Sequence, residues 1–288
     1  MVWGNLSPSP FRNVNYRVGS YGHMFTRLNE VKQISDVDIL FLGSSHAYRG
    51  FDPRMFAENN VKTFNLGSSA QTPIQTKLLL ERYLEQLNPK LIIYEVFPNT
   101  FTSDGVESSL DIIANDKIDR YTLNMALELN HIKTYNTLLF GYFSDLTNLN
   151  SKYSEPLEKN NDIYVSGGYV EKDLSYYKYV SNQAWSINLL EHQLIKFREI
   201  EQMIREAGIE LILIFAPITS SSYKSYLNLP EFKQSLSNDQ NYYDFNEILT
   251  LDDSLHFYDS HHLNQIGVEL FNKKLIEILY DHNWLDSQ

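Results

Sequence analysis

Short apolar runs alternate with a helical segment in the first third of the chain, and this alternation constrains the fold more than any other feature of the sequence. Three runs are predicted to be buried strands: residues 37–42, 61–66 and 91–96. The first two end at Gly43 and Gly67, and residues 73–87 between the second and third carry apolar side chains at helical spacing. Strand, helix and strand at these distances predict a parallel sheet with right-handed crossovers.

The same alternation resumes near the C-terminus, after a long stretch without it. Residues 189–207 predict an amphipathic helix, residues 210–215 a strand and residues 264–280 a final helix. We therefore expect a single domain over residues 1–288, with residues 1–35 as a lead-in segment that includes a helix over 24–33. Residues 101–187 are expected to be an insertion or lid, in which 118–140 supplies one or two helices.

Charge and composition narrow the kinds of chemistry and partner that the chain can have. The formal net charge of −12 makes nucleic acid an unfavourable partner, because binding a phosphate backbone requires clustered Lys and Arg. There is no cysteine, so disulfides, thiolate metal ligands and cysteine nucleophiles are excluded. The longest apolar stretch, around 211–218, is far shorter than the roughly 20 residues of a transmembrane helix. We expect a soluble protein without a transmembrane segment.

The first strand delivers the chain to the sequence Gly43-Ser44-Ser45-His46. In an open parallel sheet, functional groups gather at the carboxyl ends of the strands. A serine in a tight junction between strand and helix exposes its hydroxyl and turns its backbone N–H outward, which suits a nucleophile beside an anion-stabilising donor. Glycine and serine are also common in plain turns, so this motif alone leaves both interpretations open.

The other two predicted strands end at residues that can stabilise an oxyanion. Gly67 offers an unhindered backbone N–H and Asn99 a side-chain amide, and these are the donor types that an oxyanion hole needs. Each of the two residues is equally consistent with an ordinary turn when it is considered singly.

A further chemical motif lies just before the C-terminal helix, where Asp259 precedes His262 by three residues. At this spacing the Asp259 carboxylate can accept a hydrogen bond from the His262 Nδ1–H, which leaves Nε2 free to take a proton from a serine. We therefore interpret Ser45, His262 and Asp259 as a catalytic triad. His46 and His261 are considered as possible substrate contacts, with a turn or rim role as the alternative.

A metal site is the competing interpretation of this segment. Imidazole and carboxylate ligands suit zinc and related ions, and four such residues lie close together: His256, Asp259, His261 and His262. We expect the neighbouring side chains of His261 and His262 to diverge, and no second ligand cluster occurs elsewhere in the sequence. The sequence therefore favours acid–base chemistry, with no metal and no cofactor.

Taken together, the four segments resemble the four sequence blocks of the SGNH, or GDSL-type, hydrolase superfamily, in the same order. The resemblance implies that Ser45 is the nucleophile, that its N–H, the Gly67 N–H and the Asn99 side chain form the oxyanion hole, and that Asp259 and His262 are the family's Asp-x-x-His. It also implies a three-layer α/β/α sandwich around a mainly parallel, flavodoxin-like sheet of about five strands.

Two positions depart from the family pattern. Ser44 stands where the first block commonly has aspartate, as in DltD-like members. Phe97 and Thr100 replace the glycine and aspartate that commonly flank the third-block asparagine. The second departure weakens the assignment of Asn99 and implies a differently shaped acyl pocket.

The resemblance implies a serine-dependent hydrolase of acyl esters, with an O-acetyl ester of a carbohydrate or cell-envelope glycan as the expected substrate. Relatives with the DltD-like first block are often held outside the cytoplasmic membrane. The alternatives are a glycan O-acyltransferase and a non-catalytic glycan-binding or assembly module. Several tyrosines of the insertion are either packing residues or a platform for sugar rings: Tyr164, Tyr169, Tyr176, Tyr177 and Tyr179.

Overall fold

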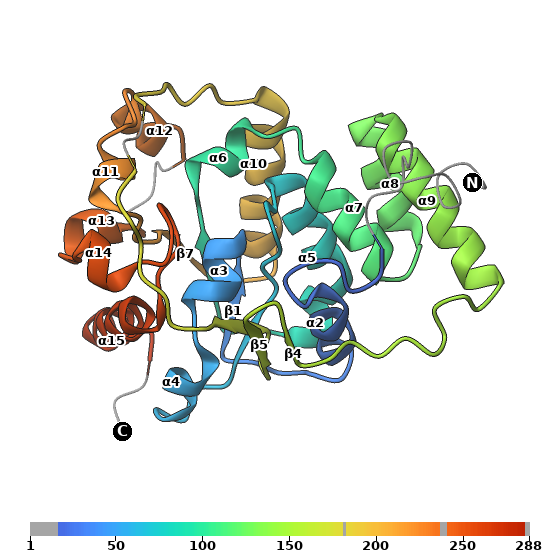
Figure 1. The fold of residues 1–288 in the computed structure, drawn as a ribbon, viewed down its shortest axis with the longest axis horizontal. Helices are drawn as coiled ribbons and strands as arrows, with labels where there is room; N and C mark the ends of the chain where they lie inside the picture. The colour runs from blue at the N-terminus through green and yellow to red at the C-terminus, as the bar shows by residue number, and fades with distance from the viewer. Residues whose placement is uncertain (1–16, 181–182, 237–240, 286–288) are drawn as a thin grey trace.

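A parallel sheet forms the centre of the molecule (Figure 1). The computed structural model describes residues 17–180, 183–236 and 241–285. Within these residues the central sheet has five strands in the order β2-β1-β3-β7-β8, and every neighbouring pair is parallel. The strands are β1 (Ile39–Leu42), β2 (Thr63–Asn65), β3 (Leu91–Glu95), β7 (Glu210–Phe215) and β8 (Tyr242–Asp244). This order matches the flavodoxin-like sheet.

Helices follow most of these strands and cover both faces of the sheet. The longer helices are α2 (Met24–Val31), α5 (Pro73–Leu87), α7 (Val106–Asn115), α8 (Arg120–Leu129), α9 (Ile132–Leu146), α10 (Glu191–Glu206), α12 (Leu229–Leu236) and α15 (Gln265–Asp281). The shorter helices are α3 (Ser45–Gly50), α4 (Pro53–Ala57), α6 (Pro98–Thr102), α11 (Ser220–Tyr223), α13 (Phe245–Ile248) and α14 (Asp253–His256).

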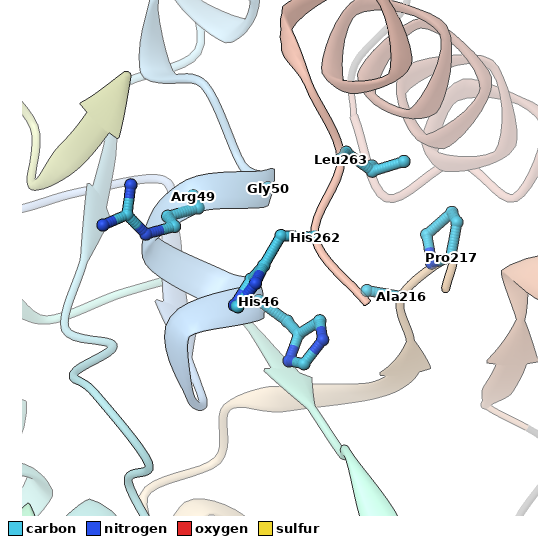
Figure 2. A pocket seen from close by; sticks show the side chains of 7 residues that line it. All are labelled: His46, Arg49, Gly50, Ala216, Pro217, His262 and Leu263. Atoms are coloured by element: carbon cyan, nitrogen blue, oxygen red, sulfur yellow. The ribbon is translucent and has the colours of Figure 1, made fainter. Parts of the chain in front are cut away.

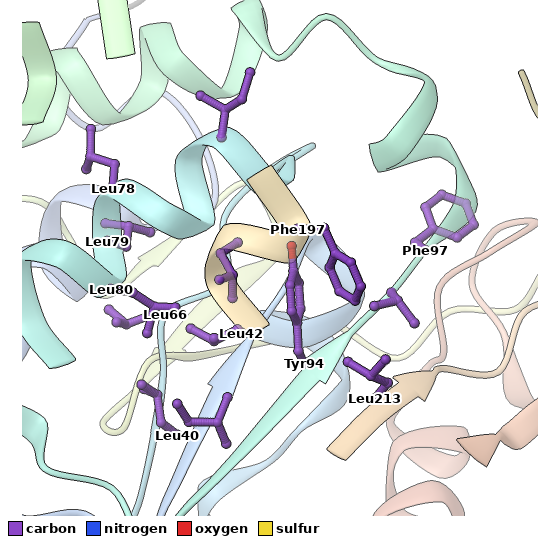
Figure 3. Packing of buried hydrophobic residues seen from close by; sticks show 14 of the residues in the cluster. Leu40, Leu42, Leu66, Leu78, Leu79, Leu80, Tyr94, Phe97, Phe197 and Leu213 are labelled. Atoms are coloured by element: carbon purple, nitrogen blue, oxygen red, sulfur yellow. The ribbon is translucent and has the colours of Figure 1, made fainter. Parts of the chain in front are cut away.

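Two hydrophobic cores lie on opposite faces of the sheet, because successive side chains of a strand point to opposite sides. In β1, Leu40 and Leu42 pack with α2, α5 and α10, whereas Ile39 and Phe41 pack with α4 and α15. Figure 3 shows the first core, in which Phe197 of α10 lies beside Tyr94 of β3. The expected three-layer α/β/α sandwich with a parallel sheet is confirmed.

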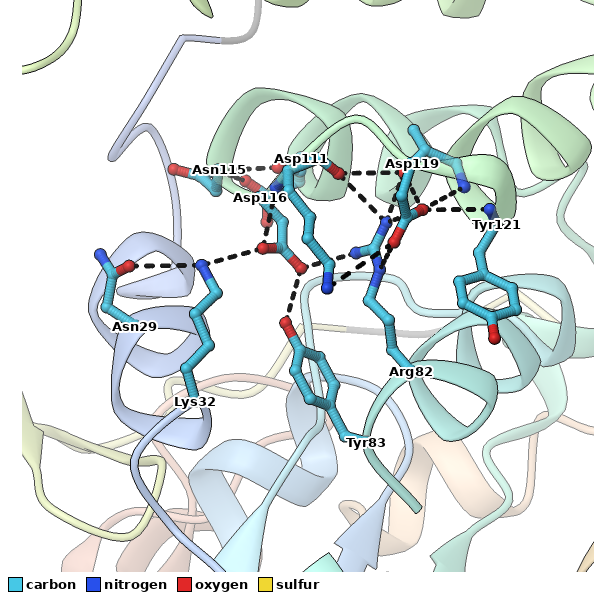
Figure 4. A network of polar contacts seen from close by, with 11 residues as sticks. Asn29, Lys32, Arg82, Tyr83, Asp111, Asn115, Asp116, Asp119 and Tyr121 are labelled. Carbon is cyan, nitrogen blue, oxygen red and sulfur yellow. Dashed lines mark hydrogen bonds and ion pairs between the residues drawn. The ribbon is translucent and has the colours of Figure 1, made fainter. Parts of the chain in front are cut away.

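The region expected to be an insertion consists of helices α7, α8 and α9 followed by a small antiparallel sheet. That sheet contains β4 (Glu158–Lys159), β5 (Asp162–Val165) and β6 (Tyr169–Lys172). Arg82 on α5 ties the helices to the sandwich, because its buried guanidinium contacts Asp116 at 2.6 Å and Asp119 at 2.7 Å (Figure 4). Arg49 on α3 makes the corresponding link to the small sheet through two hydrogen bonds to Asp162.

The structure contains the helices predicted for residues 118–140 and two features that were not predicted. Residues 118–140 were predicted to supply one or two helices, and they hold α8 and most of α9. The strand β8 and the small antiparallel sheet were not predicted. Residues 1–16 of the expected lead-in lie outside the described residues. Among the described helices, none combines the length and the apolar character that crossing a bilayer requires.

Candidate active site

Ser45 is the first residue of α3, immediately after the turn that follows β1. The turn depends on Gly43, whose φ of +135° is a conformation that other residues rarely adopt. A Cβ on Gly43 would also lie 2.8 Å from the Cβ of Glu95 on the neighbouring strand. Ser44 is the N-cap of α3, so the turn presents Ser45 at the carboxyl edge of the sheet.

Three side chains from distant parts of the sequence form a continuous hydrogen-bonded line at this edge. The Oγ of Ser45 lies 2.8 Å from Nε2 of His262, and Nδ1 of His262 lies 2.8 Å from Oδ2 of Asp259. Although burial alone would raise the pKa of Asp259, its hydrogen bond and charge interaction with His262 hold that pKa well below the ordinary value. Asp259 is therefore ionised and accepts a hydrogen bond from the Nδ1–H of His262. Nε2 of His262 then carries the lone pair that faces the Ser45 hydroxyl.

The His262 imidazole stacks with two other rings. The ring centroid of His46, from α3, lies 4.9 Å from that of His262, and the centroid of Tyr258 lies 5.3 Å from it. Figure 2 shows His46 and His262 side by side, one from α3 and the other from the loop that leads into α15. The Asp259 carboxylate also accepts the backbone N–H of His262 at 2.8 Å, which fixes the loop that carries the ring. The imidazole is thus oriented before any substrate binds.

The buried carboxyl group of Glu95 holds the turn that contains Ser44. Oε2 of Glu95, at the end of β3, accepts the backbone N–H of Ser44 at 3.2 Å and lies 2.9 Å from its Oγ. The same Ser44 Oγ lies 3.0 Å from Nδ1 of His46. Burial raises the pKa of Glu95 to about 8, against the opposing effect of the Ser44 hydrogen bonds, so Glu95 is protonated at neutral pH. His46 is neutral too, because burial and the nearby His262 lower its pKa well below the ordinary value.

The three expected oxyanion donors differ in availability. The N–H of Ser45 is the first in α3, a position at which a helix has no internal acceptor. The N–H of Gly67 donates to Oδ1 of Asn65 at 2.9 Å, so it already has an acceptor, and its expected role in the oxyanion hole stays a prediction. Oδ1 of Asn99 accepts the hydroxyl of Tyr226 at 3.1 Å, so Nδ2 is the donor that Asn99 can offer, and Asn99 lines the same cavity as Ser45.

That cavity has a volume of about 200 Å³ and lies beside the Ser45 hydroxyl. Phe97 and Thr100, the two residues that depart from the family pattern, both contribute to its wall. His46 and His261 line it as well, so the structure places both expected substrate contacts at the cavity.

Asn99→Ala is expected to lower kcat for ester hydrolysis by about 100- to 1,000-fold, the usual effect of removing one oxyanion donor. KM is expected to change little, because the donor acts mainly on the charge that develops during the reaction. Steady-state kinetics of the purified variant measure both parameters. Tyr226→Phe is the matched variant, since it retains Asn99 and removes only the hydroxyl that orients it, and a smaller decrease is expected. An unchanged kcat in Asn99→Ala would contradict the assignment.

Glu95→Gln is expected to flatten the pH dependence of stability. Because the pKa of Glu95 rises from 4.5 to about 8 on folding, its stabilising contribution is complete below pH 4.5 and is lost as the pH rises through about 8. Glutamine carries no such titration. Between about pH 5 and about pH 8.5, the melting temperature of the wild type should therefore fall more than that of Glu95→Gln. Glu58→Gln, at an exposed position, is expected to follow the wild type. Parallel curves for Glu95→Gln and the wild type would refute this role.

The structure brings together three of the four residues of the alternative metal site. The expectation that His261 and His262 diverge is wrong, because their ring centroids lie 4.2 Å apart. Asp259, His261 and His262 form a group whose possible ligand atoms lie within 4.8 Å of one another. His256 points elsewhere, with Nδ1 accepting the backbone N–H of Asp252. A metal on Asp259 and His262 would displace the proton that joins them, so the hydrogen bonds of the group fit acid–base chemistry better than metal binding.

The chain is similar to several solved structures at low sequence identity. No protein-family model and no curated protein sequence matches the chain. Among solved structures, it is similar to a GDSL-like lipase from Bacteroides thetaiotaomicron, with 11% identity, a TM-score of 0.44, and coverage of 91% of this chain and 98% of the other. It is also similar to an acetyl xylan esterase from the rumen bacterium Butyrivibrio proteoclasticus, with 10% identity, a TM-score of 0.36, and coverage of 88% and 66% respectively.

Three residues of the site were not found from the sequence: Glu95, Tyr226 and Tyr258. Only Glu95 left a readable signal, because it is a carboxylate within an otherwise apolar strand and such a group is buried at a cost unless it has a partner or a proton. Tyr226 and Tyr258 lie in loops, where no periodic pattern tells which direction a ring points. Their contacts with Asn99 and His262 depend on tertiary structure.

Proposed function

We propose that this chain is a serine-dependent ester hydrolase of the SGNH type. The observation that carries the proposal is the line from Ser45 through His262 to Asp259, with two hydrogen-bond distances of 2.8 Å. A serine that lies within reach of an imidazole, itself oriented by a carboxylate, is the arrangement used for nucleophilic attack on acyl groups.

In the proposed reaction, His262 Nε2 takes the proton from the Ser45 hydroxyl as Ser45 Oγ attacks the ester carbonyl carbon. The oxyanion that forms is stabilised by the Ser45 N–H and the Asn99 amide. His262 then gives its proton to the departing alcohol oxygen as the ester bond breaks, which leaves an acyl-serine. Water attacks this intermediate with His262 as the base, so the free acid and the Ser45 hydroxyl are regenerated.

The acyl group is proposed to be short, with acetyl as the favoured case. The cavity beside Ser45 has a volume of about 200 Å³, below the range of about 300–1,000 Å³ that is typical for drug-sized ligands. Phe97 contributes bulk to its wall at a position where the family commonly has glycine. A carbohydrate O-acetyl ester is the proposed natural substrate.

The proposal is tested with purified protein and p-nitrophenyl esters of increasing acyl length. We expect turnover of the acetyl ester, with a decrease in kcat/KM for the decanoyl ester because the longer chain exceeds the cavity. Adding glycan acceptors separates the two enzymatic alternatives, since an acyltransferase forms an acylated glycan and a hydrolase releases acetate. Absence of turnover with every ester and acceptor would instead favour a non-catalytic binding module.

A further inference from the structure

A second cavity, of about 150 Å³, adjoins the one that contains Ser45. The two cavities share Phe97, Asn99 and His261, so they meet at the proposed oxyanion donor Asn99. An ester has an acyl part and an alcohol part on either side of its carbonyl carbon. Two cavities that meet beside the oxyanion donor therefore provide one space for each part.

The direction of proton transfer decides which cavity receives the alcohol. In the proposed reaction, His262 donates its proton to the alcohol oxygen as that alcohol leaves. Ser260, two residues before His262 in the same loop, lines the second cavity but not the first. The alcohol part therefore belongs in the second cavity, and the acyl part belongs in the cavity beside Ser45 and its N–H.

Two aromatic rings form a fixed wall of the second cavity. Trp185 and Tyr226 contact each other edge to face, with ring centroids 5.4 Å apart. Their backbones are also paired, because the Trp185 N–H donates to the carbonyl of Ser225 at 2.9 Å and the Trp185 carbonyl accepts from the N–H of Leu227 at 3.0 Å. The rings are thus held in place by backbone hydrogen bonds and can serve as a rigid apolar surface for a ligand.

The remaining wall is polar and carries no charge at neutral pH. Apart from the two rings and the shared residues, it is built from an amide, an aliphatic side chain and three hydroxyls: Gln183, Ile218, Ser222, Ser225 and Ser260. His261 is neutral at pH 7 because burial and the nearby His262 lower its pKa to about 4. The lining contains no Asp, Glu, Lys or Arg, so nothing in it would balance the charge of a phosphate, carboxylate or ammonium group.

The serine hydroxyls of this wall are held by hydrogen bonds to neighbouring protein groups. The Ser222 hydroxyl donates to the carbonyl of Ser260 at 2.9 Å and accepts the hydroxyl of Thr219 at 2.9 Å. The Ser225 hydroxyl donates to the carbonyl of Ser222 at 2.6 Å, and a hydroxyl that donates in this way still has acceptor capacity. An aromatic surface beside neutral hydroxyl and amide groups matches a ring that has one apolar face and hydroxyls around its edge.

From these observations we infer that the second cavity binds the alcohol part of the substrate and that this part is a neutral sugar ring, with Trp185 as its stacking surface. The inference rests on the proposed ester hydrolysis and specifies its substrate class. The inference assigns the stacking of a sugar ring to Trp185 instead of the tyrosines of the insertion that were first considered for it. Those tyrosines contact other residues or lie outside both cavities. Tyr164, for example, contacts Glu30, and Tyr169 pairs with Gln265.

The test compares two acetyl esters that differ only in their alcohol: p-nitrophenyl acetate and a methyl glucoside acetylated on one hydroxyl. Trp185→Ala is expected to lower kcat/KM for the sugar ester about 10-fold more than for p-nitrophenyl acetate, mainly through KM. Trp185→Phe, which retains an aromatic face, should restore part of this difference. Tyr142→Ala, at an exposed position on α9, is the control and should leave both values unchanged.

A second comparison uses the wild type alone, so it does not depend on whether a variant folds. The neutral acetylated glucoside should be hydrolysed with a kcat/KM at least about 10-fold higher than the corresponding acetylated glucuronide, because the cavity offers no cation for the carboxylate. Equal kcat/KM values for the two sugar esters would overturn the inference, and so would an equal loss of kcat/KM on both acetyl esters in Trp185→Ala. In either case, turnover of p-nitrophenyl acetate by the wild type would still support the proposed hydrolase. Absence of turnover with any ester would overturn both.

Discussion

Ser45→Ala is expected to lower kcat for p-nitrophenyl acetate by about four orders of magnitude or more, to near the background rate. In the proposed reaction the Ser45 hydroxyl supplies the nucleophile, and among the described residues no other hydroxyl lies within hydrogen-bond distance of His262 Nε2. KM is expected to stay close to the wild-type value wherever residual turnover permits its measurement, because the walls of both cavities are retained. Steady-state kinetics with freshly purified enzyme provide the measurement.

Ser151→Ala is the matched control for this variant. Ser151 lies at an exposed position beyond α9, away from both cavities, so its replacement should leave kcat unchanged. Ser45→Ala should also melt at nearly the same temperature as the wild type, since the alanine removes only a hydroxyl at the start of a helix. A folded Ser45→Ala variant with near-normal ester turnover would show that Ser45 is not the nucleophile.

Asp259→Asn is expected to lower kcat by about 1,000- to 10,000-fold. An asparagine at this position can still accept the backbone N–H of His262 through its Oδ1, so the loop should retain its structure. Its amide would donate to Nδ1, however, and the His262 proton would then move to Nε2. In that tautomer His262 cannot accept the proton of Ser45, so the nucleophile loses its base.

Asp252→Asn provides the control for the loss of an acidic side chain in the same region. Asp252 caps the short helix α14 and does not contact the His262 ring. We expect its kcat to stay within about threefold of the wild type, since a cap affects mainly stability. If Asp259→Asn and Asp252→Asn had similar, small effects on kcat, the role of Asp259 in orienting the imidazole would be refuted.

The parallel core of the fold was predictable because its strands are short, apolar and bounded by recognisable residues. The strand over 210–215 and the helix over 73–87 match the predicted limits, since glycine and proline mark their ends. The strand β8 was missed because Tyr242–Asp244 is only three residues long and mixes polar with aromatic side chains. Its pairing is decided by the neighbouring strand β7 rather than by its own pattern.

The packing of the helices in the insertion was not predictable, for a different reason. In α9 the small polar side chains of Thr134, Thr137 and Ser144 are buried, whereas Leu139 and Leu146 are exposed. This reverses the usual relation between hydrophobicity and burial, so the apolar spacing of the sequence did not reveal which face packs inward. Whether the whole chain forms one domain, and whether the insertion acts as a lid, stay predictions.

The site was predictable where a single loop or turn carries the chemistry. Asp259 and His262 are three residues apart, and Ser45 directly follows a strand, so sequence reasoning could name them without knowing how they approach one another. The hydrogen bonding of Gly67 was not readable, because whether its N–H is free depends on the rotamer of Asn65. The catalytic roles of all these residues stay predictions that the experiments test.

The most direct measurement is mass-spectrometric mapping of the protein after reaction with a fluorophosphonate that traps activated serines. We expect one stoichiometric adduct on the peptide that contains Ser45, and its loss when Asp259 is replaced by asparagine. An adduct on another serine, or no adduct in a protein that hydrolyses esters, would contradict the proposal that Ser45 is activated by His262 and Asp259.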